Sequence, residues 1–151
     1  MPLISLDMEH IDSIVCLETA LFTRPFTAVS LASLFAGKAF AGYALRDDKD
    51  HRGDILSYIL LHRVLDEAEI LSLGTAHTHQ GKGYAHRLLS ETCQLLLEGG
   101  IHRLHLDVAA PNVAALALYK GCGFLESGRR PGYYGTAPHR QDAIIMSKTL
   151  R

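Results

Sequence analysis

The stretch from Glu67 to Gly100, EAEILSLGTAHTHQGKGYAHRLLSETCQLLLEGG, limits the possible folds more than any other part of the chain. It predicts a buried strand over Ala68–Ala76, a glycine-rich turn over Gln80–Ala85 and a helix that ends at Gly99 and Gly100. A strand, a turn with free backbone N–H groups and a helix N-terminus together form a site for an anion. We therefore expect this turn to bind the pyrophosphate of a cofactor.

The composition excludes several classes of protein. The chain has 151 residues, 48% of them hydrophobic and 21% charged, which is typical of one soluble domain over residues 1–151. The net charge of −1, without a basic run, argues against a nucleic-acid binder or a membrane-surface protein. No apolar run approaches a membrane span, and Met1-Pro2 opens no signal peptide. The three widely spaced cysteines, Cys16, Cys93 and Cys122, indicate a reducing cytoplasm and no disulfide framework.

The nine histidines require a check for a metal site. His77-Thr78-His79 is the only close pair in the sequence, and no cysteine or carboxylate stands beside it at ligand spacing. We expect a polar loop at this position, and no metal.

The rest of the chain predicts an α/β domain of order β-α-α-β-β-β-α-β-α-β-β. Four helices are expected. The first is capped by Asp7 and runs to about Phe22, and the second is capped by Thr27 and runs to Phe35. The third follows the glycine turn, and the fourth runs from Pro111-Asn112 to about Lys120. Strands are expected at Leu3–Leu6, Ala39–Arg46, Asp54–Arg63, Glu67–Ala76, Leu104–Val108, Phe124–Arg129 and Ala143–Lys148. A helix crossover makes the strands on either side of the central helix parallel, whereas hairpins join the others. The sheet is therefore mixed and flanked by helices.

Two common phosphate-binding motifs fail at the glycine turn. A Walker A loop needs a hydroxyl after its lysine, but Lys82 is followed by Gly83. A dinucleotide fingerprint needs a third glycine in the first strand-turn-helix unit, but His86 occupies that position and this unit is not the first. The motif that remains is Q-x-x-G-x-A, from Gln80 to Ala85.

This motif, after a strand and at the start of a helix, resembles the pyrophosphate loop [QR]-x-x-G-x-[GA] of the GNAT superfamily of N-acetyltransferases. The resemblance is greatest to the RimI type, the ribosomal-protein-alanine N-acetyltransferases. The segments that carry it are DEAEILSLGTA, LHLDVAAPNVAALALYKGCGF and GYYGTAPHRQDAIIM. The first third of the chain matches only in layout, and RPFT stands where the family usually has Pro-Trp-Ser.

The resemblance implies acetyl-CoA as the cofactor. Backbone groups of Leu73, Gly74 and Thr75 would hold the pantetheine arm and the thioester oxygen, and Gly74 either allows close approach of a ligand or marks a bulge. The pyrophosphate loop would comprise Gln80, Gly81, Lys82, Gly83, Tyr84 and Ala85, where Lys82 is either a phosphate contact or a solvated lysine. Asn112 matches a cofactor-contacting residue of the family, although an asparagine there is also a helix cap.

The resemblance also implies direct attack of an amine on the thioester. Tyr119 matches the general acid that protonates the departing thiolate. For the base we place Asp107 first, where the RimI type has a longer Glu, and Glu69 second, with a water chain as the remaining route. Asp107 could instead pair with Arg103 or His105, and Glu69 could be a surface charge.

The acceptor site is expected between Phe22–Thr27, which contains Phe26, and the loop Pro131–Pro138, which contains Tyr133 and Tyr134. Asp142 could receive a cation there, or pair with Arg130 or Arg140. The expected acceptor is a protein N-terminus, which in the RimI type is that of a ribosomal protein. The alternatives are a small amine as the acceptor, or a non-catalytic protein that only senses acyl-CoA. An α-amine of pKa ~8 needs less help from a base than a lysine of pKa ~10.4, which favours the N-terminus. The sequence predicts no oligomeric state.

Overall fold

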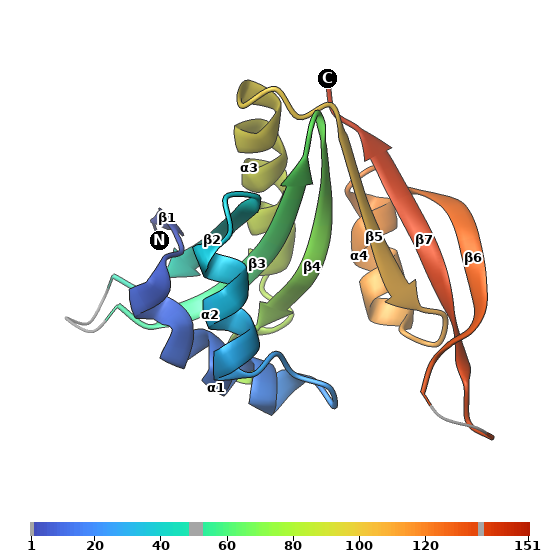
Figure 1. The fold of residues 1–151 in the computed structure, drawn as a ribbon, viewed down its shortest axis with the longest axis horizontal. Coiled ribbons are helices and arrows are strands. Elements are labelled where there is room, and N and C mark those ends of the chain that lie inside the picture. The colour runs from blue at the N-terminus through green and yellow to red at the C-terminus, as the bar shows by residue number, and fades with distance from the viewer. Residues whose placement is uncertain (1, 49–52, 136–137) are drawn as a thin grey trace.

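A computed structural model describes residues 2–48, 53–135 and 138–151 (Figure 1). The strands in these residues are β1 Leu3–Ser5, β2 Phe40–Arg46, β3 Ile55–Val64, β4 Glu67–Thr75, β5 Arg103–Ala109, β6 Leu125–Tyr134 and β7 Gln141–Thr149. The α-helices are α1 Ile11–Leu21, α2 Ala28–Ala36, α3 Tyr84–Glu98 and α4 Val113–Gly121, with short 3₁₀ helices η1 Met8–His10 and η2 His77–His79. None of the helices in the described residues is long and apolar enough to cross a bilayer.

The strands form one mixed sheet in the order β1-β2-β3-β4-β5-β7-β6. Only β4 and β5, the strands joined through α3, are parallel; the other neighbouring pairs are antiparallel. The predicted α/β class, element order and parallel central pair are confirmed. The predicted polar loop at His77–His79 is instead one turn of 3₁₀ helix, η2.

The two central strands separate soon after they meet. The register of β4 and β5 covers Glu67–Glu69 against Arg103–His105 only, and Figure 1 shows the strands diverging beyond that point. Within β4, Ser72 pairs with Leu60 and Ile70 pairs with Leu61, so Leu71 is an extra residue that forms a β-bulge. A bulge bends and twists its strand, which contributes to the separation.

Helices cover both faces of the sheet. Because side chains alternate along a strand, β3 contributes to two cores. Tyr58 and Leu60 pack with Ile14 of α1 and Leu31 of α2 on one face. Ile59 and Leu61 pack on the other face, in the cluster that contains the α3 side chains Leu88, Leu89 and Leu96. Leu96 follows Leu89 by seven positions and Leu88 by eight, so these three side chains form one buried stripe of α3.

The last hairpin is longer than its sequence predicts. Pro131 and Gly132 indicate a loop, but β6 continues to Tyr134, which pairs with Gln141. The extra residues form an irregularity between Arg130 and Tyr134, with Gly132 at φ 60°. Asp142 stabilises this bend, since its carboxylate accepts Gly132 N–H at 2.9 Å and Arg129 Nε–H at 2.8 Å. The ion-pair partner of Asp142 is thus Arg129, and not Arg130 or Arg140, the two partners that the sequence suggested.

Gly74 lies in regular pairing with Tyr58, so the bulge that was one of two alternatives for this position falls at Leu71 instead. The close approach that Gly74 allows is to protein side chains. A Cβ at residue 74 would lie 2.8 Å from Leu21 Cδ1 and 2.8 Å from the Tyr58 hydroxyl oxygen. The glycine therefore lets α1 and the Tyr58 ring pack directly on β4.

We expect Gly74→Ala to lower the free energy of unfolding by about 1–3 kcal/mol, the usual cost of overpacking a core. Gly121→Ala is the matched control, because a Cβ there meets nothing within 4 Å at the end of α4. Alanine in a helix is favoured over glycine by up to about 1 kcal/mol, so the control should be neutral or more stable. Urea unfolding measures both variants, and equal stability of Gly74→Ala and the wild type would contradict the packing described here.

Candidate active site

A cavity of about 730 Å³ lies between the end of β4, the glycine turn and α4. Of the residues predicted to bind the cofactor, those that line this cavity are Leu73, Gly74, Thr75, Gln80, Gly81, Gly83, Tyr84, Ala85, Asn112 and Tyr119. Lys82 is exposed and does not line it, which is the position of a solvated loop lysine. The fold thus brings together two segments that lie far apart in the sequence.

The glycine turn lines this cavity, and the backbone N–H groups of Gly81 and Gly83 have no hydrogen-bond partner within the described residues. Gly81 and Gly83 have φ of 76° and 82°, a left-handed conformation that favours glycine. Gly83 is the N-cap of α3, which has no side-chain cap, whereas Thr27 and Asn112 cap α2 and α4. The first N–H groups of a helix lack intrahelical partners, and the helix dipole makes this end attractive to an anion. The turn therefore fits a pyrophosphate group.

The backbone of β4 offers further hydrogen-bonding groups. Ala76 N–H donates to Leu56 O at 2.8 Å. Because bonded pairs alternate along an antiparallel ladder, Gly74 bonds toward β3 while Leu73 and Thr75 face the opposite edge, where β5 has diverged. Thr75 O accepts the Gln80 amide at 3.0 Å, which ties the glycine turn to the strand. Leu73 is the predicted residue whose backbone is best placed to meet a ligand.

A second cavity, of about 620 Å³, lies in the gap between β4 and β5. It shares lining residues with the first cavity, namely Phe22, Leu73, Asn112, Ala115 and Tyr119. Three predicted residues, Phe26, Asp107 and Tyr134, line the second cavity alone. The two cavities therefore meet at Leu73 and Tyr119, between the glycine turn and the candidate acceptor residues.

Tyr119 stands at the junction of the two cavities. Its side chain is buried, with 7% of its surface exposed, and its ring packs edge-on against Phe124 at 5.5 Å between centroids. Burial raises the pKa of Tyr119 above the ordinary value of a phenol, because water no longer solvates the phenolate. The hydroxyl makes no hydrogen bond to any residue that the structure describes. Tyr119 is thus a protonated group that is available to a ligand.

Asp107 lines the second cavity from β5, with 19% of its side chain exposed. Its Oδ2 is 3.7 Å from Arg130 Nη1 on β6, so it pairs with neither Arg103 nor His105. Arg103 is instead 3.7 Å from Glu67. The sequence could not identify Arg130 as the partner, because the β6–β7 hairpin carries it there.

The two tyrosines of β6 lie beside Asp107. The rings of Tyr133 and Tyr134 pack edge to face at 5.0 Å, and the Arg130 guanidinium lies over Tyr133 at 5.2 Å. Burial, and then the negative charge of Asp107, raise the pKa of Tyr134. Tyr134 lines the second cavity, whereas Tyr133 does not and is 51% exposed.

Glu69 and Asn112 differ in how well their positions suit the predicted roles. Glu69 lies opposite His62 and His105 in the sheet and lines neither cavity, so its position suits a base less well than that of Asp107. Asn112 lines both cavities, and its Oδ1 also accepts Ala115 N–H at 3.2 Å. The cap and the predicted ligand contact are thus compatible.

Glu18 is a site residue that sequence reasoning missed. It lies on α1, lines the second cavity and is only 2% exposed. One signal could have found it: residue 18 follows Ile11 by seven positions and Ile14 by four, so it falls on the apolar stripe of its helix. A charged residue at such a position is buried and needs partners.

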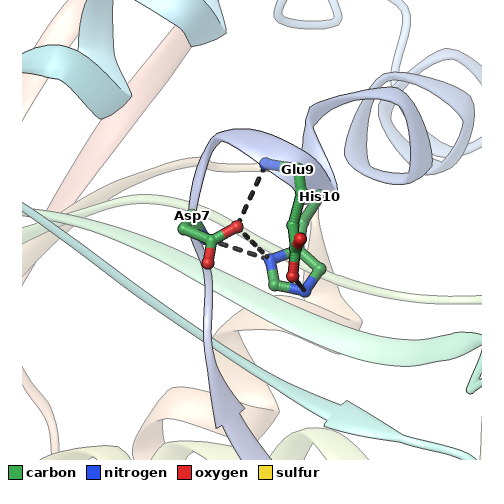
Figure 2. A group of neighbouring side chains, drawn as sticks. All are labelled: Asp7, Glu9 and His10. Carbon is green, nitrogen blue, oxygen red and sulfur yellow. Dashed lines mark hydrogen bonds and ion pairs between the residues drawn. The ribbon is translucent and has the colours of Figure 1, made fainter.

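A group of side chains that could bind a metal ion lies at the short helix η1, just before α1, and lines neither cavity. Ligand atoms of Asp7, Glu9 and His10 lie within 4.8 Å of one another (Figure 2). Their contacts form a cap for η1: Asp7 Oδ1 accepts Glu9 N–H at 3.0 Å, and His10 Nδ1 accepts Asp7 N–H at 3.0 Å. Exposed acidic groups of this kind are common without an ion, and the capping role accounts for the arrangement.

Comparison with known proteins assigns the family. The sequence profile of the Acetyltransferase (GNAT) family matches residues 11–124, so the chain belongs to this family. The chain is 37% identical over 95 residues to ribosomal protein bS18-alanine N-acetyltransferase of Escherichia coli (strain K12). That alignment covers 63% of this chain and 64% of the relative, slightly less than two thirds of the relative's length.

Two further comparisons extend over nearly the whole chain. A Bacillus subtilis (strain 168) protein that is provisionally assigned the same activity is 30% identical over 143 residues, which are 95% of this chain and 91% of the relative. The crystal structure of the ribosomal-protein-S18-alanine N-acetyltransferase from Escherichia coli superposes with a TM-score of 0.90 at 28% identity. It covers 99% of this chain and 93% of that chain, which confirms the single GNAT-type α/β domain.

Proposed function

We propose that this protein transfers the acetyl group of acetyl-CoA directly to the N-terminal α-amine of a protein. The observation that carries the proposal is the junction of two cavities at Leu73 and Tyr119. One cavity begins at the uncapped N-terminus of α3, and the other contains the carboxylate of Asp107. A donor and an acceptor can therefore enter from two sides and meet beside a buried phenol.

The residues of the chain divide the work as follows. The N–H groups of Gly81, Gly83 and Ala85 hold the pyrophosphate, and the Leu73 backbone orients the thioester that acetyl-CoA supplies. Asp107 accepts a proton from the acceptor amine, directly or through a water. Tyr119 donates its proton to the departing sulfur. Holding the amine against the thioester in reactive geometry provides a large part of the acceleration.

The named activity of the relatives supports a ribosomal protein as the acceptor. The Escherichia coli relative is a ribosomal protein bS18-alanine N-acetyltransferase by name, and the present chain shares its fold. A ribosomal acceptor would place the reaction in the cytoplasm. The chain differs from the RimI-type pattern at Asp107 and at RPFT (24–27). Asp107, Arg24 and Phe26 line the second cavity, which we call the acceptor cavity, so the preferred N-terminal sequence need not be the same.

Free-thiol release with a panel of acceptors tests the proposed function. The panel contains peptides with a free N-terminal alanine, the same peptides blocked at the N-terminus, and small amines such as spermidine. We expect thiol release with the free peptides only. Release with small amines alone would contradict a protein acceptor. A rise in melting temperature with acetyl-CoA, without turnover of any acceptor, would indicate an acyl-CoA sensor.

We expect Gly83→Ala to raise KM for acetyl-CoA by about twofold to fivefold, because displaced N–H groups lose most of the ~0.3–1 kcal/mol that a helix N-terminus contributes. Gly100→Ala is the matched control. Both glycines have φ above 80° and open space around a Cβ, but Gly100 lies at the other end of α3. Both variants should lose about 1–2 kcal/mol of stability from left-handed strain. Steady-state kinetics should show the change in KM for Gly83→Ala alone, and an equal change in both would contradict the pyrophosphate site.

A further inference from the structure

Glu18 joins three separate segments that surround the acceptor cavity. Its Oε1 accepts Phe26 N–H, from the loop between α1 and α2, at 3.0 Å. Its Oε2 accepts the Ser72 hydroxyl of β4 at 2.7 Å, and also the hydroxyl of Tyr58 on β3. A single carboxylate thus ties the acceptor loop to two strands of the sheet.

The bonds of Glu18 fall where the sheet is irregular. Ser72 directly follows the bulge at Leu71, shortly after Glu69, which is the last residue of β4 that pairs with β5. Tyr58 can reach Glu18 because Gly74 leaves room for its ring. Burial, and then the hydrogen bond to Glu18, raise the pKa of Tyr58, so this hydroxyl remains a donor throughout the range in which the enzyme can be assayed.

Burial of Glu18 is unfavourable for the free energy of folding, so a purely structural role explains this residue poorly. It is 2% exposed, and no lysine, arginine or histidine in the described residues forms an ion pair with it. A buried charge balanced only by neutral donors is often less stable than apolar packing of the same volume. The same carboxylate does provide rigidity, because hydrogen bonds to an ionised acceptor are stronger and more directional than neutral ones.

We propose that Glu18 is a positioning residue for the acceptor amine: by fixing Phe26 against Ser72, it sets the wall of the acceptor cavity that faces Asp107. The inference rests on the proposed acetyl transfer. Phe26 and Ser72 line the cavity from the α1–α2 loop and β4, whereas Asp107 and Tyr134 line it from β5 and β6. A displacement of one wall by about 1 Å moves the amine out of reactive distance and can cost up to ~10²-fold in rate. Glu18 does not line the first cavity, which begins at the glycine turn, so acetyl-CoA binding should not depend on Glu18.

Kinetics of Glu18→Gln test this role. The substitution keeps the size of the side chain but replaces Oε2 by an amide nitrogen. This nitrogen cannot accept the hydrogen bonds that the hydroxyls of Tyr58 and Ser72 donate to Oε2. We expect KM for an acceptor peptide to rise by roughly tenfold, part of the loss that misplacement can cause. KM for acetyl-CoA, and the increase in melting temperature that acetyl-CoA causes, should change by less than about twofold. Calorimetric titration of the peptide into the CoA-bound protein should show the same loss of acceptor affinity.

Two further variants separate positioning from folding. Ser72→Ala removes one donor and leaves the bonds to Phe26 and Tyr58, so it should fold and show a smaller increase in acceptor KM. Asp12→Asn removes a charge from the exposed face of α1 and should behave as the wild type. Unchanged acceptor KM in both Glu18→Gln and Ser72→Ala, or equal increases for acceptor and acetyl-CoA, would overturn the inference while wild-type turnover still supports the proposed function. Absence of wild-type turnover with every acceptor would overturn both.

Discussion

Replacing Tyr119 by phenylalanine is expected to lower kcat by about 10²-fold or more, the usual loss when a general acid is removed. Tyr119 lies at the meeting point of the two cavities, and its hydroxyl has no hydrogen-bond partner in the described part of the chain. Burial raises its pKa, so the phenol keeps its proton at neutral and moderately alkaline pH. Burial disfavours both the thiolate that receives the proton and the phenolate that the transfer leaves on Tyr119, so the transfer depends on direct contact between the two groups.

The structure also predicts what Tyr119→Phe leaves unchanged. The ring packs against Phe124 and stays in place, and no internal hydrogen bond is lost, so the melting temperature should not fall. KM for acetyl-CoA should remain within about twofold of the wild-type value, since the hydroxyl acts mainly on the departing sulfur. Tyr43→Phe, on β2 and away from both cavities, is the control. A wild-type kcat in Tyr119→Phe would remove Tyr119 from the mechanism.

Asp107→Asn should produce a loss of activity that depends strongly on pH. An α-amine of pKa ~8 is neutral in about one molecule in a hundred at pH 6, one in ten at pH 7 and one in two at pH 8. A base can at most make every bound amine neutral, so these fractions set the largest loss of rate that its removal can cause. The rate should fall by as much as ~10²-fold at pH 6, about tenfold at pH 7 and about twofold at pH 8. The asparagine keeps the size of the side chain and removes only the basic oxygen.

Glu69→Gln is the companion to Asp107→Asn, because Glu69 is the other carboxylate with a claim to be the base. It lines neither cavity, so its rate-versus-pH profile should match that of the wild type. A profile altered in Glu69→Gln alone would move the base to Glu69. If neither variant changes the acidic limb, solvent removes the proton. The kinetics should be measured as kcat/KM for the peptide between pH 6 and pH 9.

Local patterns in the sequence predicted most of the fold. Leu104, Leu106 and Val108 alternate with polar residues and form the buried face of β5. Gly81 and Gly83 mark the left-handed turn before α3, and Leu88, Leu89 and Leu96 form its buried stripe. Each of these features depends on neighbours within a few residues, so the pattern and the structure agree. The resemblance to a known family then placed Tyr119 and Asn112 with the glycine turn.

Features that depend on contacts between distant segments could not be read from the sequence. The bulge at Leu71 is set by the register between β3 and β4, and no local signal marks it. The pair between Asp107 and Arg130 requires the β6–β7 hairpin to fold back over β5. Glu18 acquires its partners from β3, β4 and the α1–α2 loop, although its place on an apolar stripe was visible.

Acetylation of a peptide that carries a free N-terminal alanine and an internal lysine tests the central claim most directly. The protein is incubated with the peptide and acetyl-CoA, and fragment masses in a tandem mass spectrum locate the added acetyl group. A protein N-terminal acetyltransferase places one acetyl group on the α-amine and leaves the lysine free. Acetylation of the lysine alone, or an unmodified peptide together with no change in melting temperature on addition of acetyl-CoA, would contradict the account.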